Sequence, residues 1–188
     1  MQVHYVSVAM EDVHGRAGVT PQHGFSSIVY ACRPQSRGHV GLYDTKVDSP
    51  PALYPNFFSD EQDLIDTRNG FRETRRVFLQ KAFDEYRGAQ LKPPQDINID
   101  DDDELDAWIR QTGETLYHPV GTCKMGQDEM AVVDAQGSVH GLLGLRVVDA
   151  SLMPTLIAGN TNAPTIMLAE KISDAILGKK AMAPEAVR

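Results

Sequence analysis

The apolar residues of this chain come in short runs separated by glycine and proline. These breaks bound the strands and helices of the chain, and they limit the possible folds more than any other feature of the sequence. Over roughly the first 55 residues, the runs VHYVSVAM, FSSIVYACR and HVGLYD are short and rich in β-branched and aromatic residues. Such runs are typical of strands, and the short turns between them favour antiparallel pairing. We therefore expect an antiparallel sheet in this part of the chain, within an α/β or α+β fold.

The segment SDEQDLIDTRNGFRETRRVFLQKAF, residues 59–83, has the pattern of a helix. Its apolar residues recur at helical spacing, and Ser59 with Gln62 fits the start of a capping box. Glycine is a poor helix former, so a break near Gly70 is expected.

Residues 100–104 form an acidic cluster with two interpretations. The carboxylates invite comparison with a calcium site, but they stand immediately before LDAWIRQT, a helical segment. Carboxylates in the first turn stabilise the positive end of a helix. We favour this helix-capping interpretation over a calcium site.

Nearer the C-terminus, VVDAQGSVHGLLGLRVVDASLMP alternates apolar runs with glycine-containing turns. This pattern predicts a hairpin followed by a buried strand at residues 145–148.

The clearest helix follows the sequence GNTNAP. It is predicted to have a side-chain cap at Thr161 or Asn162, Pro164 in its first turn, and Gly178 at its end. Residues 179–188 have no periodicity and are expected to form a flexible tail. The apolar positions at helical spacing are Ile166, Ala169, Ile172 and Ile176.

The composition indicates an acidic globular protein, with a formal charge of -8 and 41% hydrophobic residues. Lysine and arginine are scattered, whereas nucleic-acid binding needs a concentrated basic patch. No run reaches the ~18 apolar residues that span a bilayer, and the N-terminus lacks the pattern of a signal peptide. The two cysteines, Cys32 and Cys123, are too few for a disulfide framework. This low cysteine content favours a reducing compartment. We expect a cytoplasmic protein, with peripheral membrane association left open.

The segment YHPVGTCKMG, residues 117–126, places His118 before a proline and a glycine-containing turn. Taken by itself, a single histidine favours a structural role with backbone partners. His118 and Cys123 are two possible metal ligands with no second pair at usable spacing, so we expect no metal site.

Three segments in this order identify a protein family far more specifically than the single histidine does. They are YHPVGTCKMG, GLRVVDASLMP and AGNTNAPTIMLAEKISDAI. They resemble the glucose–methanol–choline (GMC) oxidoreductases, and within them the bacterial choline dehydrogenase and alkanol dehydrogenase branch. The likeness is strongest over residues 115–177, and HGFSSIVYACRPQSRGHVGL upstream also resembles the substrate domain of that branch. The resemblance implies a partial substrate-binding domain at residues 1–115. It also implies a C-terminal FAD and active-site segment at residues 116–178, containing the last strand and helix of an FAD-binding domain.

The same resemblance implies FAD-dependent oxidation of an alcohol to an aldehyde. His118 matches the catalytic histidine of the family, the base that takes the hydroxyl proton while hydride leaves for the flavin. Asn160 matches a second active-site position, where an amide can orient the substrate. A simple turn role for Asn160 after Gly159 stays open.

The resemblance also places the cofactor. Thr161, Asn162 and Thr165 would start the helix whose positive end faces the flavin, and such an end suits an anionic cofactor. Asp149 and Ala150 would lie beside the ribityl and phosphate region of FAD.

No strand, GxGxxG and helix fingerprint of a dinucleotide fold occurs in the sequence. We therefore expect this chain to act as the C-terminal part of a larger enzyme, with an N-terminal FAD-binding portion and a small alcohol as its partners. Two alternatives stay open. One is a related flavoprotein with oxidase or hydroxynitrile lyase chemistry, and the other is a non-catalytic remnant without flavin.

Overall fold

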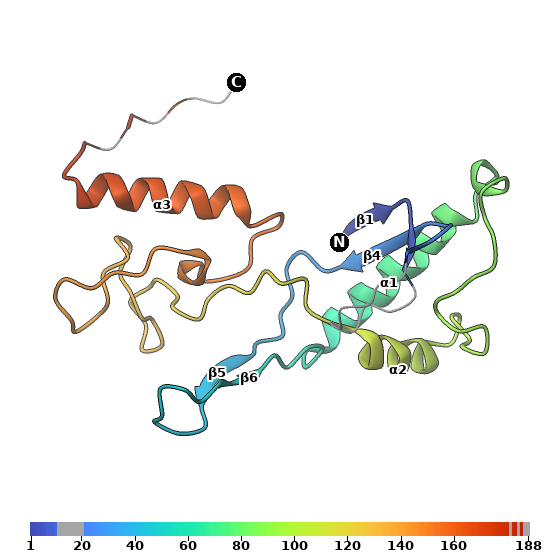
Figure 1. The fold of residues 1–188 in the computed structure, drawn as a ribbon, viewed down its shortest axis with the longest axis horizontal. Helices are drawn as coiled ribbons and strands as arrows, with labels where there is room; N and C mark the ends of the chain where they lie inside the picture. The colour runs from blue at the N-terminus through green and yellow to red at the C-terminus, as the bar shows by residue number, and fades with distance from the viewer. Residues whose placement is uncertain (11–20, 181, 184, 186–188) are drawn as a thin grey trace. The chain divides into compact units, whose positions relative to one another are not determined.

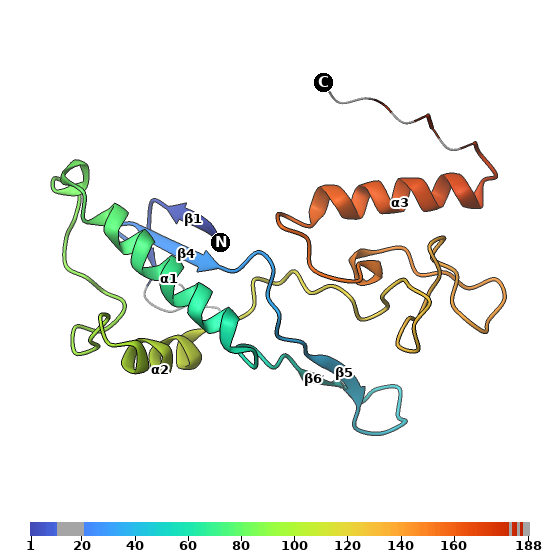
Figure 2. The same cartoon turned by 180° about the vertical axis from the view of Figure 1, so that it is seen from behind.

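The chain divides into two units, Met1–Leu116 and Tyr117–Arg188, each with its own apolar core. The computed structural model describes residues 1–10, 21–180, 182, 183 and 185. Figures 1 and 2 show the elements of each unit from two opposite sides. No helix in these described ranges is long and apolar enough to cross a membrane.

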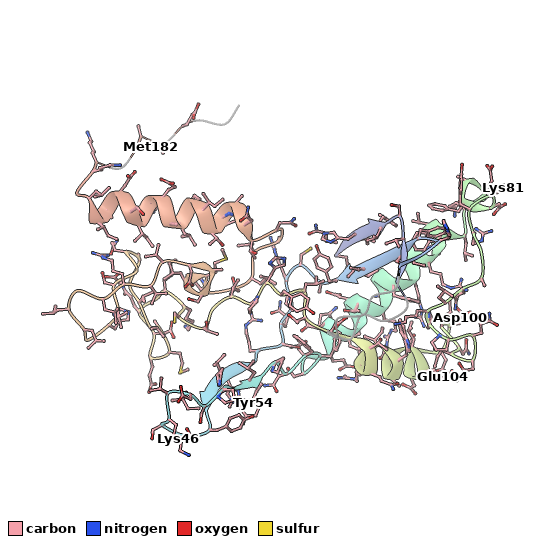
Figure 3. The ribbon with its side chains drawn as sticks, viewed as in Figure 1. Lys46, Tyr54, Lys81, Asp100, Glu104 and Met182 are labelled. Atoms are coloured by element: carbon pink, nitrogen blue, oxygen red, sulfur yellow. The ribbon has the colours of Figure 1, made fainter. Side chains whose placement is uncertain are left out.

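Short antiparallel strand pairs characterise the first unit, as the sequence predicts, but in the part of it that the structure describes they form three two-stranded sheets rather than one. The pairs are β1 (Gln2–Val6) with β4 (Ser26–Tyr30), β2 (Ala9–Met10) with β3 (Pro21–Gln22), and β5 (His39–Leu42) with β6 (Pro51–Tyr54). Strand β6 lies outside the predicted runs, because a short strand that starts with proline carries little strand signal. Figure 3 shows Tyr54 on β6 and Lys46 in the loop before it.

Helix α1 (Glu61–Phe78) runs unbroken through Gly70, so the predicted break is wrong. The glycine is needed for close packing rather than for a bend. A Cβ at Gly70 would lie 2.5 Å from Met1 Cε and 3.0 Å from Val29 Cγ1 of β4. Tertiary contact between α1 and β4, visible in Figures 1 and 2, therefore overrides the low helix propensity of glycine.

The first residues of the two helices in this unit can be compared with the predicted N-terminal caps. The cap of α1 is Asp60, whose Oδ1 accepts from Gln62 N at 2.9 Å, so the prediction of Ser59 is wrong by one residue. Ser59 belongs to the preceding turn, where its N–H donates to the carbonyl of Asn56. Helix α2 (Asp102–Thr112) confirms the helix-capping interpretation of the acidic cluster, because Asp101 Oδ1 accepts from Glu104 N at 3.0 Å. Figure 3 shows Glu104 at this end of α2.

The core of the first unit lies between α1 and α2. Its buried residues are Leu64, Leu105 and Ile109, and the half-buried side chains around them are Phe58, Phe71 and Trp108. Arg68 of α1 also forms ion pairs with Asp102 and Asp106 of α2. A short 3₁₀ turn, η1 (Lys81–Phe83), follows α1.

Asp63 ties the first turn of α1 to the irregular segment after β4. It is buried, and its two carboxylate oxygens accept from Gln35 N and Ser36 N, each at 2.7 Å. Burial acts to raise the pKa of Asp63, but hydrogen bonds from Ser36 and Gln35, with the charge of Arg37, outweigh it and lower the pKa. The folded unit therefore favours the ionised carboxylate.

Asp63→Asn should lower the free energy of unfolding of this unit by about 1–3 kcal/mol near neutral pH, because one of the two backbone N–H groups bonded to the buried carboxylate loses its acceptor. A carboxyl whose pKa is lower when folded stabilises the fold above its unfolded pKa of about 3.9, and this stability is lost as pH falls through the folded pKa. Urea unfolding followed by fluorescence of Trp108, the single tryptophan, measures both effects. The control is Glu61→Gln, an exposed carboxylate in the same turn. Equal stability of the two variants would contradict the prediction.

The second unit is mostly irregular, and the predicted strand at residues 145–148 is wrong. Among the described residues, the strand-like pairings of this unit are isolated bridges: Met125 with Val133, Val133 with Val139, and Ser138 with Arg146. Leu145 is 50% exposed, and the residues around it are joined by turns at Gly141 and Gly144, both with φ of +76°. The run at residues 145–148 is flanked by glycine turns on one side and by a 3₁₀ turn, η2 (Ala150–Leu152), on the other. These turns leave no room for a regular series of strand hydrogen bonds.

Helix α3 (Asn162–Ile176) packs on this irregular segment through Ile172, which joins Val133 and Leu152 in the core. Gly178 follows with φ of +67°, which confirms the predicted end. The predicted apolar face is only partly buried, because Ile166 and Ile176 are 54% and 55% exposed. Of the predicted tail, residues 181, 184 and 186–188 lie outside the described residues.

Candidate functional site

The segment 117–126 is irregular, yet backbone hydrogen bonds fix it from two sides. On one side it meets η2, and on the other it meets Val132 and Val133, the second of which forms a bridge with Met125. The bonds are Cys123 N to Ser151 O at 3.2 Å, Met125 N to Leu152 O at 2.9 Å, Val132 N to Lys124 O at 3.0 Å and Gly126 N to Val133 O at 3.0 Å. The loop that begins with His118 is therefore anchored to the core of the unit.

The backbone on both sides of His118 is constrained. Tyr117 has a φ of +62°, a left-handed conformation that is unusual for a bulky residue and costs of order 1–3 kcal/mol. Pro119 restricts the preceding residue, His118, to extended conformations. The His118 side chain is exposed, so its ring is accessible to a small molecule. Strain next to an accessible imidazole is typical of a functional position.

The structure brings His118 to Thr161, which lies 43 residues away in the sequence. Thr161 Oγ1 is 3.5 Å from His118 Nδ1, at the outer limit of a hydrogen bond, and Thr161 is only 8% exposed. Asn160 is exposed and directly precedes Thr161. The catalytic candidate and the start of α3 therefore share one site.

The predicted side-chain cap of α3 is wrong, although Thr161 does occupy the capping position. Its side chain makes no capping hydrogen bond, and its backbone is helical, with φ of -79° and ψ of -17°. A capping side chain normally accepts from the second or third residue of the helix, and the third residue here is Pro164, which has no N–H. The hydroxyl of Thr161 faces the histidine instead.

The other predicted cofactor residues take different positions. Asn162 is the exposed first residue of α3, and Thr165 Oγ1 donates to Thr161 O at 2.7 Å within the helix. Asp149 caps η2, because its Oδ1 accepts from Ser151 N at 2.8 Å and from Ser151 Oγ. Ala150 is half-buried at the start of that turn.

The start of α3 suits an anionic group. Helices α1 and α2 have acidic residues in their first turns, whereas α3 has none. Its positive end is therefore not neutralised by a carboxylate of the same turn, and it has no side-chain cap. These features fit the negative charge of a flavin, which increases on reduction.

Two features of this site are not among the sequence predictions. One is the left-handed Tyr117, for which the sequence gives no signal. The other is the pairing of Thr161 with His118. The sequence contains one indication of that pairing. Pro164 stands at the third helical position and removes an N–H that a threonine cap could bind, which leaves the Thr161 hydroxyl available to another partner.

Comparison with known proteins finds matches that extend over both units of the chain. Residues 34–169 match the C-terminal family model described as GMC oxidoreductase. The oxygen-dependent choline dehydrogenase of Escherichia coli is 46% identical over 182 residues, which is 97% of this chain and 32% of the relative. The protein of the same name from Klebsiella pneumoniae is 47% identical over 180 residues, again 32% of the relative and 96% of this chain. The chain thus spans about a third of the length of these relatives.

Solved structures give the same result. Formate oxidase from Aspergillus oryzae superposes with a TM-score of 0.78 and 28% identity, covering 88% of this chain and 29% of that one. Pyridoxine 4-oxidase from Mesorbium loti gives 0.72 and 28%, covering 93% and 33%. An FAD-dependent oxidoreductase from Chaetomium thermophilum gives 0.74 and 27%, covering 82% and 27%. These similarities confirm the predicted fold class and the resemblance seen in the three C-terminal segments.

Proposed function

The chain belongs to the GMC oxidoreductase family, and on that basis we propose that it is the part of an FAD-dependent alcohol dehydrogenase that supplies the catalytic base. The observation that carries the proposal is the position of His118. Its ring is accessible, its backbone is held between a left-handed tyrosine and a proline, and its Nδ1 faces the start of α3. The relatives named choline dehydrogenases support an alcohol as the substrate class.

His118 takes the hydroxyl proton of the alcohol in this proposal. Imidazole suits the task because its ordinary pKa is close to neutral pH, so both protonation states are accessible. Asn160, next to the His118 partner Thr161, donates a side-chain N–H to the developing alkoxide and orients it. Bound FAD supplies the acceptor for the hydride that leaves the carbon.

The residues that would hold FAD are those at the start of α3 and at η2. Asn162 and Thr165 belong to the uncapped, uncharged first turns of α3, which fit the flavin ring. Asp149 has only Oδ1 engaged among the described residues, so its second oxygen can accept from a ribityl hydroxyl beside Ala150. Residues 1–115 serve as a partial substrate-binding domain and residues 116–178 as the active-site segment.

A second candidate keeps this site and changes the electron acceptor. The solved structures that match include pyridoxine 4-oxidase and formate oxidase. Oxygen consumption during turnover separates an oxidase from a dehydrogenase that passes electrons to another acceptor.

A hybrid enzyme tests the proposal. In this hybrid, called the graft, the chain replaces the segment of the E. coli relative that it matches over 182 residues. We expect the graft to bind FAD and to be bleached anaerobically by a primary alcohol such as choline. Asn160→Ala in the graft should lower kcat/KM by an amount equivalent to about 1–3 kcal/mol, because the alkoxide loses a hydrogen-bond donor.

The parent enzyme, treated identically, is the control for the graft. A graft that folds and binds FAD but is not reduced by any alcohol that reduces its parent would overturn the proposed function. An Asn160→Ala variant with unchanged kcat and KM would leave Asn160 as a turn residue only.

A further inference from the structure

Thr161 stands at the capping position of α3 but does not cap the helix. Threonine in this position usually stabilises a helix through its hydroxyl, and α3 forgoes that contribution. Pro164 removes one of the two backbone donors that the hydroxyl would use, and the helical backbone of Thr161 is not that of a capping residue. The hydroxyl is thereby released for another partner.

That partner is His118 Nδ1, at 3.5 Å. Thr161 is 8% exposed, so water does not readily replace the ring as the partner of its hydroxyl. We propose that Thr161 is a positioning residue for His118, whose hydroxyl accepts from Nδ1–H and leaves Nε2 as the unprotonated nitrogen. This inference rests on the proposed role of His118 as a base.

The position of each proton during the reaction follows from the two ring nitrogens of His118. A neutral imidazole has one N–H and one lone pair, so an Nδ1–H held by Thr161 places the lone pair on Nε2. When the alcohol O–H bond breaks, its proton forms the new Nε2–H bond and the ring becomes an imidazolium. Nδ1–H is kept throughout and continues to donate to Thr161 Oγ1. The same hydroxyl therefore selects the reactive tautomer and supports the charged ring.

The placement also links the two polar members of the site. Asn160 and Thr161 are consecutive, so one stretch of backbone carries both the residue that orients the substrate and the residue that orients the base. A shift of the start of α3 would displace both together.

The test measures the His118 tautomer by long-range ¹H–¹⁵N NMR of the 188-residue chain, at a pH where the ring is neutral. We expect Nδ1–H in the wild type and in Thr161→Ser, which keeps the hydroxyl. Thr161→Val, similar in shape but without a hydroxyl, should shift His118 toward the Nε2–H tautomer. Pro164→Ala supplies an N–H at the third helical position that competes for the hydroxyl, so it should shift the ring in the same direction.

His140 is the matched control, because its Nε2 is 3.1 Å from Gly126 O in the same unit and away from α3 in sequence. An unchanged His140 spectrum shows that a variant is folded. Where Thr161→Val does not fold, Pro164→Ala carries the test. Nε2–H in the wild type, or Nδ1–H retained in the folded Thr161→Val or Pro164→Ala variant, overturns the positioning role. Failure of the graft to oxidise alcohols would instead overturn the proposed function and leave the tautomer result standing.

Discussion

Flavin reduction in the graft slows by about 10²-fold or more when His118 is replaced by Ala or Gln, which is the usual scale for a positioned acid–base group. The loss falls on the chemical step, because neither replacement can take the hydroxyl proton at neutral pH. The FAD content should change little, since the proposed cofactor residues lie at α3 and η2. Anaerobic stopped-flow spectroscopy with a good alcohol substrate measures the rate, and the flavin-to-protein absorbance ratio measures the content.

His140→Ala is the control for this loss, because it removes a second exposed imidazole from the same unit. It should leave the rate of flavin reduction close to that of the unmodified graft. Near-normal reduction by His118→Ala would remove His118 as the base, whatever the control shows.

The 188-residue chain purified by itself is expected to lose FAD on gel filtration and to oxidise no alcohol. Nanomolar binding corresponds to about 12 kcal/mol, whereas a helix terminus contributes ~0.3–1 kcal/mol when exposed and up to ~2 kcal/mol when partly buried. Dinucleotide folds hold the pyrophosphate at a glycine-rich turn, and the sequence has no GxGxxG fingerprint. The difference is too large for the start of α3 to supply.

The measurement is a visible spectrum after incubation with excess FAD and removal of free cofactor. The graft, treated in the same way, is the positive control and should stay yellow. A stoichiometric yellow 188-residue chain that an alcohol bleaches anaerobically would show that other residues of this sequence replace the dinucleotide site.

Local features of the sequence predict local structure well here. The acidic cluster before α2 and Gly178 after α3 act through neighbouring backbone groups, so a short window of sequence contains the whole interaction. The cap of α1 is misplaced by one residue because Ser59 and Asp60 are both good capping residues, and only the preceding turn decides between them.

Features that depend on distant parts of the chain are predicted less well. Gly70 continues a helix because β4 lies against it, and no window around Gly70 contains β4. The run at residues 145–148 has strand composition, but a strand also needs a partner, and only isolated bridges form there. The spacing of Ile166 and Ile176 identifies a helix face without showing how far the core extends beneath it.

The motifs indicate which residues belong to the candidate site, but they do not indicate how those residues contact one another. His118 and Asn160 come from the resemblance, whereas the pairing of Thr161 with His118 depends on the orientation of one hydroxyl. Pro164 is the one local cue to that orientation.

The sequence separation of 43 residues between His118 and Thr161 also sets the order in which the site can form during folding. The entropic cost of closing a loop rises with its length, and it must be offset by contacts made elsewhere in the loop. Val133 and Leu152 lie between the two residues, and they meet Ile172 of α3 in the core. We therefore expect the imidazole and the hydroxyl to meet only after this core has condensed, so that their pairing reports folding of the whole second unit rather than of any single element.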